Sequence, residues 1–130
     1  MDYKYEASPA VVKKFLKDIK EIISSASFNP NRDFFMQKRE NDLSTSLYTN
    51  YNSMMILGYT TVDVINEIKS LTSDHYCETV IDTISTNVNL HVFKKKIKGE
   101  IVYIKITIRN NSKILCISFH ISKEKNWYAL

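Results

Sequence analysis

The stretch IVYIKITIRNNSKILCISFHI, residues 101–121, decides the fold. Apolar and polar side chains alternate from Ile101 to Arg109 and again from Lys113 to Ile121, and this period of two is typical of β-strands. Between them stands Asn110-Asn111, and asparagine tolerates the positive φ of a tight primed turn. The stretch therefore predicts an antiparallel hairpin, which a further strand over Leu90–Ile97 and a turn at Lys98-Gly99 extend to three strands.

Burial sets the expected register of this hairpin. The apolar rows of the two strands share a face when a two-residue turn places Arg109 opposite Ser112. These rows are Val102, Ile104, Ile106 and Ile108 on one strand and Leu115, Ile117 and Phe119 on the other. On the opposite face, this register pairs Tyr103 with Ser118, Lys105 with Cys116, and Ile101 with His120. Tyr103 and His120 are then diagonal neighbours, with backbones about 7–8 Å apart.

Helical periodicity predicts the elements before the hairpin. Ser8 and Pro9 suit the N-cap and first position of a helix over Ala10–Ser24, with an apolar stripe of Val11, Val12, Phe15, Ile19, Ile22 and Ile23. Thr60 begins a helix through Leu71, with a stripe of Val64, Ile65, Ile68 and Leu71. Between these helices, the sequence indicates a loop over 25–32 and a helix over 41–57 with Leu43, Leu47, Met54 and Leu57 facing inward. A short helical turn over 74–79 and a loop over 80–89 complete the expectation.

These elements predict one α+β domain over residues 1–130. The expected arrangement is helical over 1–80, with the helices packed on one face of an antiparallel sheet over 90–121. The chain has 130 residues, with only two Gly and two Pro, which suits a single domain without long linkers. No apolar run approaches the roughly 20 residues that cross a bilayer, and the polar N-terminus resembles no signal peptide, so we expect a cytoplasmic protein with no membrane partner.

Few cofactor chemistries are compatible with this sequence. Gly58 and Gly99 are the only glycines, so no glycine-rich phosphate loop is present. Cys77 and Cys116 have neither a disulfide framework nor a metal-binding spacing, and we expect both to be reduced, small hydrophobic residues. We therefore expect no metal and no small-molecule cofactor.

Positive charge is concentrated at the C-terminal end. Residues 91–130 contain nine Lys or Arg and two Glu, a net charge of +7, whereas residues 1–90 contain nine basic and twelve acidic residues, a net charge of −3. Such a distribution is typical of a protein that binds a polyanion. A solvated basic strand surface that only aids solubility explains the same numbers.

The polar face of the hairpin is the candidate site. It carries Tyr103, Lys105, Arg109, Ser118 and His120, which is a set suited to cleaving RNA. An imidazole serves as acid or base near neutral pH, and cations stabilise charge that builds on phosphorus. Tyrosine can stack a base or donate a hydrogen bond to phosphate. We therefore assign Tyr103, His120 and Lys105 as catalytic, and Lys94, Lys96, Arg109, Ser118 and His91 as substrate-binding candidates.

Each of these residues also has a structural interpretation. A tyrosine on a strand often packs half-buried, and a single histidine near a strand end is often structural. The run Lys94-Lys95-Lys96 is typical of a solvated edge that discourages sheet pairing. What favours the catalytic interpretation is the convergence of several groups on one face. The face on which His91 lies depends on a register that alternation does not determine.

Several short motifs resemble the MqsR-type toxins of bacterial type II toxin–antitoxin systems. The resemblance rests on Leu57-Gly58 with Ile65 and Ile68, Leu71-Thr72 with Tyr76, Val92-Phe93, Val102-Tyr103-Ile104-Lys105-Ile106 and Ile117-Ser118-Phe119-His120, with a similar first helix at Val12-Lys13-Lys14-Phe15-Leu16. It implies a RelE-like fold, metal-independent cleavage of mRNA, neutralisation by a cognate antitoxin, and a catalytic role for Tyr103. The chain departs from the family pattern at Cys77, Leu90 and His120, where the family is expected to have Lys, Gln and Lys.

Three functions therefore compete at this stage. The first is an endoribonuclease toxin that cleaves mRNA by attack of the 2′-hydroxyl. The second is a non-catalytic RNA- or protein-binding module on the same scaffold. A DNA-binding regulator is the third, but no helix with clustered Arg and Lys supports it.

Overall fold

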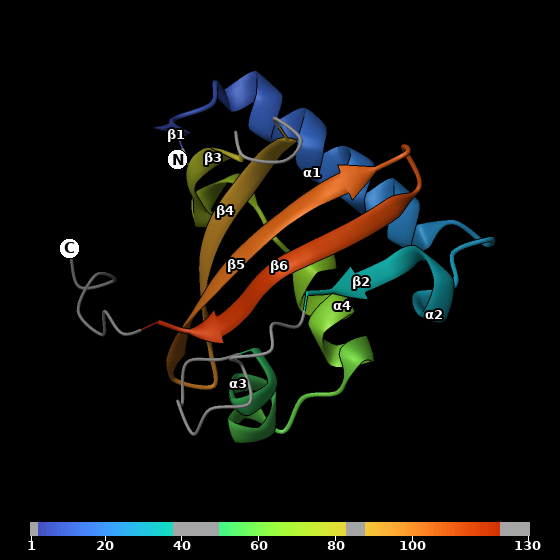
Figure 1. Ribbon diagram of the computed structural model, residues 1–130, viewed down its shortest axis with the longest axis vertical. Coiled ribbons are helices and arrows are strands. Elements are labelled where there is room, and N and C mark those ends of the chain that lie inside the picture. The colour runs from blue at the N-terminus through green and yellow to red at the C-terminus, as the bar shows by residue number, and fades with distance from the viewer. Residues whose placement is uncertain (1–2, 38–49, 83–87, 123–130) are drawn as a thin grey trace.

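A six-stranded sheet with helices on one face forms the protein (Figure 1). The computed structural model describes residues 3–37, 50–82 and 88–122. The elements in chain order are β1 (Tyr3–Tyr5), α1 (Pro9–Ser24), α2 (Pro30–Asp33), β2 (Phe34–Met36), α3 (Asn50–Leu57), α4 (Thr61–Lys69), the 3₁₀ turn η2 (Ser73–His75), β3 (Tyr76–Asp82), β4 (Val88–Ile97), β5 (Glu100–Arg109) and β6 (Lys113–Ile121). The strand order is β1-β3-β4-β5-β6-β2, antiparallel except for the parallel pair of β2 and β6. The predicted α+β class is confirmed.

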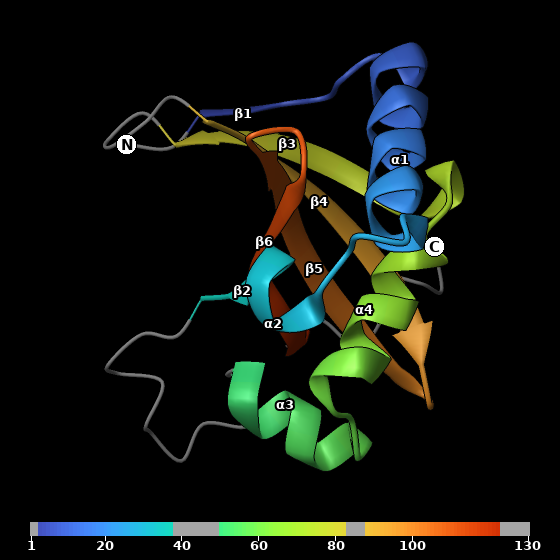
Figure 2. The same ribbon diagram turned by 90° about the vertical axis from the view of Figure 1, so that its right-hand side faces the viewer.

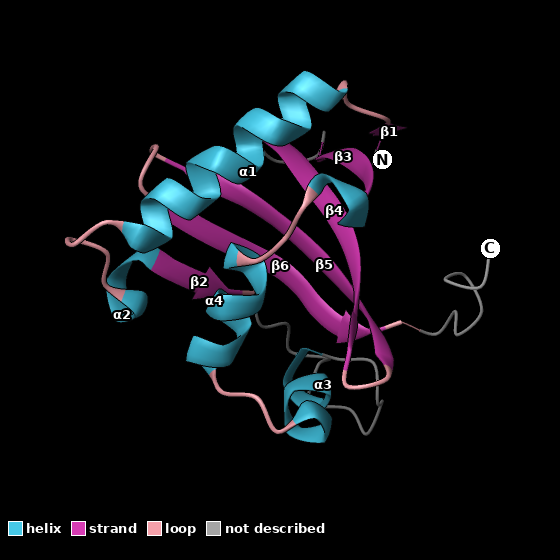
Figure 3. Cartoon of the chain, turned by 180° about the vertical axis from the view of Figure 1, so that it is seen from behind, coloured by secondary structure: helices cyan, strands magenta, loops and turns pink. Residues whose placement is uncertain are grey.

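Helices α1 and α4 cover the same face of the sheet (Figures 2 and 3). Ser8 caps α1 by accepting a hydrogen bond from the Val11 amide, as predicted, while Thr60 and Asp63 form a capping box at α4. The apolar faces of both helices pack on the sheet in one core, which includes Phe15, Ile19, Ile65, Ile68, Phe93, Ile104 and Phe119. Val11 was expected in this core but is 48% exposed, because the buried stripe of α1 consists of Val12, Phe15, Leu16 and Ile19 and leaves Val11 to one side.

The β5–β6 hairpin has the predicted strands but a different register. Asn110 and Asn111 both have positive φ, as expected of a primed turn, yet Arg109 pairs with Lys113 and not with Ser112. A bulge at Ile117 adds a second extra residue to β6. Beyond the bulge, the two extra residues together shift the pairing by two positions. The predicted register is therefore wrong, and Tyr103 lies opposite His120 instead of Ser118.

Between the turn and the bulge, the shift is a single residue, which reverses the faces of β6. Ile114 and Cys116 enter the helix-covered core in place of the predicted Leu115 and Ile117. Phe119, beyond the bulge, lies in the core as predicted, but it pairs with Ile104, where the predicted register placed Ile117. A thiol fits the buried position of Cys116, and burial raises its pKa to about 12, so it stays protonated.

Three short or unexpected strands extend the predicted sheet. Residues 76–82 form β3, where a helical turn and a loop were expected; the helical turn ends at His75. β1 pairs with β3 at one edge, and β2 pairs with β6 at the other. The predicted loop over 25–32 contains the start of α2, which Asn29 caps. Residues 41–49 of the predicted third helix lie outside the described residues.

Helix α3 completes the edge of β6 where β2 ends. The Asn50 amide accepts a hydrogen bond from the Phe119 N–H at 2.9 Å and donates to the Ile117 carbonyl at 3.1 Å. The Ser53 hydroxyl accepts from the Ile121 N–H at 2.8 Å. These side chains occupy the place of a neighbouring strand, so the second half of β6 is hydrogen-bonded on both sides.

Candidate functional site

The candidate site lies on the sheet face turned away from α1 and α4, which we call the outer face. The alternation of each strand places Glu78 on β3, Lys94 on β4, Tyr103 and Lys105 on β5, and Ser118 and His120 on β6 there. Two cross-strand rows result. One runs Lys94–Tyr103–His120, and the adjacent one runs Glu78–Val92–Lys105–Ser118.

Tyr103 and His120 form the centre of this face. They are direct cross-strand partners, and their rings stack with centroids 5.2 Å apart and planes inclined by 13°. The predicted diagonal arrangement placed them farther apart, and the two-position shift of β6 brings them together. A phenol hydroxyl and an imidazole are therefore held side by side by the sheet itself.

Two lysines flank this pair. Lys94 is the cross-strand partner of Tyr103 on β4, and Lys105 follows Tyr103 on the same face of β5, opposite Ser118. Both lysines are partly exposed. Cations at these positions give the face two points at which an anionic phosphate can be held.

The pKa of Tyr103 decides which role its hydroxyl can have. Burial, together with the nearby charges of Glu78 and Cys77, raises the pKa of Tyr103 to about 12. The phenol is thus protonated at neutral pH, and it can donate a hydrogen bond but cannot act as a base. A second, apolar cluster supports its ring on this face and consists of Val80, Leu90 and Val92, with Val88 and Ile117 at its margin.

Three candidate residues lie away from this centre. His91 is on the helix-covered face, where it is 7% exposed and contacts the Thr79 hydroxyl at 2.9 Å. Its ring packs against the ring of Phe15, with centroids 4.3 Å apart and planes tilted by 53°. Arg109 is six residues along β5 from Tyr103, or about 20 Å. Lys96 is exposed on the outer face, two residues beyond Lys94. Of these, only Lys96 is near enough to extend the site.

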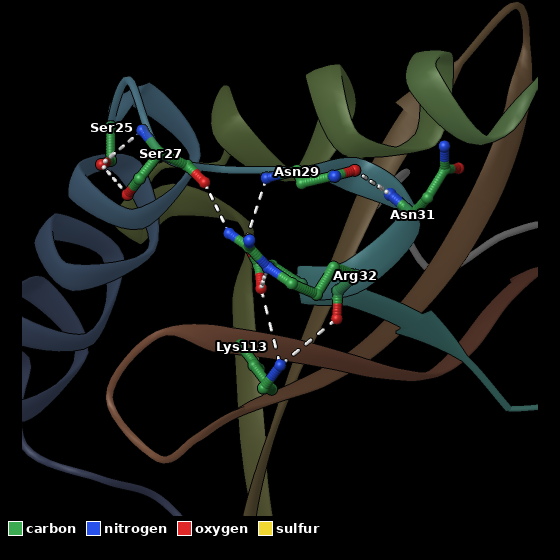
Figure 4. A network of polar contacts seen from close by, with 7 residues as sticks. Ser25, Ser27, Asn29, Asn31, Arg32 and Lys113 are labelled. Carbon is green, nitrogen blue, oxygen red and sulfur yellow. Dashed lines mark hydrogen bonds and ion pairs between the residues drawn. The ribbon is translucent and has the colours of Figure 1, made fainter.

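A separate polar cluster lies where α1, α2 and the β5–β6 turn meet (Figure 4). It borders a cavity of about 790 Å³. Here Asp33 is ion-paired with Arg32 at 2.9 Å and with Lys113 at 3.6 Å, and Arg32 also donates to the Ser27 carbonyl. The hydrogen bond from Arg32 holds the pKa of Asp33 well below its usual range. The cluster connects the loop before α2 to the β5–β6 hairpin. Its charged groups pair with one another, so we do not count it as part of the candidate site.

Sequence reasoning missed Glu78 because it placed residues 74–79 in a helical turn. The bulge at Cys77 shifts the register of β3, leaves Cys77 exposed, and turns Glu78 onto the outer face. No group of three or more His, Cys, Asp or Glu is arranged to hold a metal ion within the described ranges. Among the helices of the same ranges, none has the length and hydropathy needed to cross a membrane.

Comparison with known proteins identifies one relationship. A family model described as "Motility quorum-sensing regulator, toxin of MqsA" matches residues 13–121. The matched segment includes most of α1 and extends to the end of β6, so it contains the outer face and its stacked ring pair. Searches of curated proteins and of solved structures found no significant match.

Proposed function

Because this chain belongs to the MqsR toxin family, the toxins of toxin–antitoxin pairs, we propose that it is an endoribonuclease that cleaves mRNA and so stops translation and growth. Family membership also implies an antitoxin partner. The proposed site of action is the cytoplasm, where mRNA is present. The proposed reaction is attack of a 2′-hydroxyl on the adjacent phosphorus, without a metal ion.

One observation carries this proposal: the stacked Tyr103–His120 pair has two lysines next to Tyr103 on the outer face, Lys94 across on β4 and Lys105 along β5. Transesterification of RNA requires proton transfer and stabilisation of the charge that develops on the phosphate oxygens. The imidazole of His120 supplies the first, and the ammonium of Lys105 supplies the second. Tyr103 donates a hydrogen bond to a phosphate oxygen or stacks on a base. Lys94 and Lys96 position the RNA backbone, whereas Ser118 is only 6% exposed and lies outside this contact.

A non-catalytic binding module is the second candidate, and two positions favour it. Cys77 stands exposed in the β3 bulge, and Leu90 packs in the apolar cluster of the outer face. These are positions where the resemblance leads us to expect Lys and Gln, so a cation and an amide are missing. The same lysines would then hold RNA or a protein without cleaving it.

The two candidates separate in one assay. Purified protein incubated with a long RNA in EDTA should generate new ends, and both His120→Ala and Tyr103→Phe should slow cleavage. We expect a loss of about 10²–10⁴-fold for His120→Ala, the usual range for general acid–base catalysis. Tyr103→Phe keeps the ring and removes the hydrogen-bond donor, so the fall in its cleavage rate measures the contribution of the hydroxyl.

Tyr51→Phe, an exposed substitution on α3, is the matched control and should cleave at the wild-type rate. All variants should keep the wild-type circular dichroism spectrum. Retardation of the RNA in a gel without new ends would favour the binding module. Wild-type rates in both folded site variants would place the chemistry elsewhere.

A further inference from the structure

Helix α1 carries four lysines, and three of them share one side of the helix. Lys13, Lys17 and Lys20 recur at helical spacing, so they form a row about 10 Å long. All three are exposed, and none has an ion-pair partner within the described part of the chain. The fourth, Lys14, lies on the other side and is ion-paired with Asp18 at 2.7 Å. The unpaired positive charge of α1 is therefore gathered on one side.

This row of lysines lines a groove of about 570 Å³ between α1 and the segment that joins α4 to η2. Figure 3 shows that segment running beside α1 on the helix-covered side of the sheet. Leu16 gives the groove an apolar lining, and Ser24, Thr72 and Ser73 bring hydroxyl groups to it. One acid, Glu21, also lines the groove, so three Lys and one Glu give a net charge of +2. Ammonium and hydroxyl groups are the donors that usually contact the phosphates of a nucleic acid.

The stability of α1 does not account for this row. Lysines stabilise a helix when they lie in its last turn or pair with an acid one turn away. None of the three lies in the last turn. Lys13 and Lys17 are one turn apart, so their charges repel each other, and Lys17 is not among the described ion pairs although Glu21 follows one turn later. A polyanion bound in the groove would relieve this repulsion.

The groove lies near the outer face, around the edge of the sheet. The turn η2 packs beside both α1 and β4, and it leads directly into β3. The first residue of β3, Tyr76, pairs with Phe93, which precedes Lys94 of the outer face. An RNA strand that leaves the outer face at Lys94 can therefore reach the groove by passing the start of β3.

We propose that the groove between α1 and η2 binds the backbone of the same RNA strand that, under the proposed function, is cleaved on the outer face. Lys13, Lys17 and Lys20 contact its phosphates, and the hydroxyls of Thr72 and Ser73 donate to phosphate oxygens. The groove contains none of the residues assigned to the chemical step. It therefore contributes affinity and not the rate of that step, and it favours long single-stranded RNA over short oligonucleotides as the substrate.

Binding of the full-length protein to a 2′-O-methyl RNA tests the groove without cleavage, because this probe has no 2′-hydroxyl. A length of about 30 nucleotides exceeds the roughly 4–16 nucleotides of a single site. Replacing Lys13, Lys17 and Lys20 together by Ala should reduce the slope of log affinity against log salt concentration by up to about 2.1, at about 0.7 for each lost contact. Lys17→Ala alone should reduce the slope by about 0.7. Its matched control, Lys14→Ala, removes the same charge from the other side of α1 and should leave the slope unchanged.

Cleavage of unmodified RNA separates the groove from the outer face. On RNA of about 30 nucleotides, the triple variant should raise KM and keep the wild-type kcat. On an oligonucleotide of about 5 nucleotides, which is too short to join the two sites, both constants should stay at wild-type values. Alanine favours the helix, and the circular dichroism spectrum should confirm that every variant is folded.

The failure of the groove and the failure of the endoribonuclease function give different results. An unchanged salt slope in the triple variant would overturn the role of the groove and leave an acidic protein segment as the occupant that its charges fit. Equal changes of slope in Lys14→Ala and Lys17→Ala would also overturn it, because the RNA would then respond only to net charge. An equal rise in KM for both RNA lengths would do the same. If wild type binds long RNA through these lysines but leaves it intact, the endoribonuclease function fails and the groove remains an RNA-binding site.

Discussion

At the scale of single residues, a largely buried hydrogen-bonded chain joins the segment before α1 to the sheet. The Ala7 N–H donates to the Tyr76 hydroxyl at 2.9 Å. That hydroxyl contacts the Thr79 hydroxyl at 2.6 Å, which contacts Nδ1 of His91 at 2.9 Å. Because Ala7 can only donate, the simplest direction makes Nδ1 an acceptor. Burial lowers the pKa of His91, which favours this neutral form.

Removing the hydroxyl of Thr79 should interrupt this chain. Thr79→Val keeps the shape but leaves the Tyr76 hydroxyl and the His91 ring nitrogen without their shared partner. A buried polar group without a partner costs about 1–3 kcal/mol, so we expect Thr79→Val to lower the free energy of unfolding by at least that amount. Thr79→Ser keeps the hydroxyl, loses one methyl group, and should cost about 0.8 kcal/mol. Urea denaturation of both variants measures the difference, and equal losses would contradict the role of the chain.

His91 shows what alternation can and cannot predict about one residue. In β5, apolar and polar residues alternate, and the sequence correctly predicts that Tyr103 and Lys105 share a face. In β4, Leu90, His91, Val92 and Phe93 are all buried, because helices cover one face of the strand and the small apolar cluster around Val80 shields the other. Without alternation, no face can be assigned from sequence. His91 was therefore a plausible site residue until the structure placed it against Phe15.

At the scale of elements, α3 is stabilised by polar contacts and not by an apolar stripe. Its buried residues are Asn50, Ser53 and Leu57, and two of the three are polar. Periodicity predicts a helix here with Met54 and Leu57 inward, and Leu57 is indeed buried. It cannot predict that Asn50 and Ser53 face inward. These two side chains are buried because they hydrogen-bond to the edge of β6 that no strand pairs with. Likewise, the extra residues in β6 have no signature in the hydrophobic pattern, so its register could not be predicted.

Replacement of Asn50 tests the contact between α3 and β6. Asn50→Leu should leave the Phe119 N–H and the Ile117 carbonyl without partners and cost about 1–3 kcal/mol for each group. Asn50→Asp keeps the acceptor for Phe119 and loses the donor, so its cost should be intermediate. Amide hydrogen exchange adds a local measure: the Phe119 amide should exchange faster in Asn50→Leu than in Asn50→Asp. Unchanged exchange in both variants would mean that α3 does not protect this edge.

At the scale of the whole molecule, the C-terminal positive charge is divided between the two faces of the sheet. Lys94, Lys96 and Lys105 belong to the outer face. Lys95 points to the helices, where it is ion-paired with Glu67 at 2.7 Å and donates to the Ser70 hydroxyl. Lys98 donates to the Leu57 carbonyl at the end of α3. The sequence therefore predicts the excess of charge but overstates the part that lies on the outer face, where we propose that RNA binds.

This division predicts how each lysine contributes to RNA binding. Each phosphate contact with single-stranded RNA adds about 0.7 to the slope of log affinity against log salt concentration. Replacing Lys94 and Lys96 by Ala should therefore reduce the slope by up to about 1.4, and weaken binding similarly for different RNA sequences. Lys95→Ala removes the same charge from the same segment but on the helix-covered face. It should lower stability through the loss of its pair with Glu67 and leave the slope unchanged. Fluorescence anisotropy at several salt concentrations measures the slopes. A larger change for Lys95→Ala than for the outer-face pair would mean that RNA does not bind on the outer face.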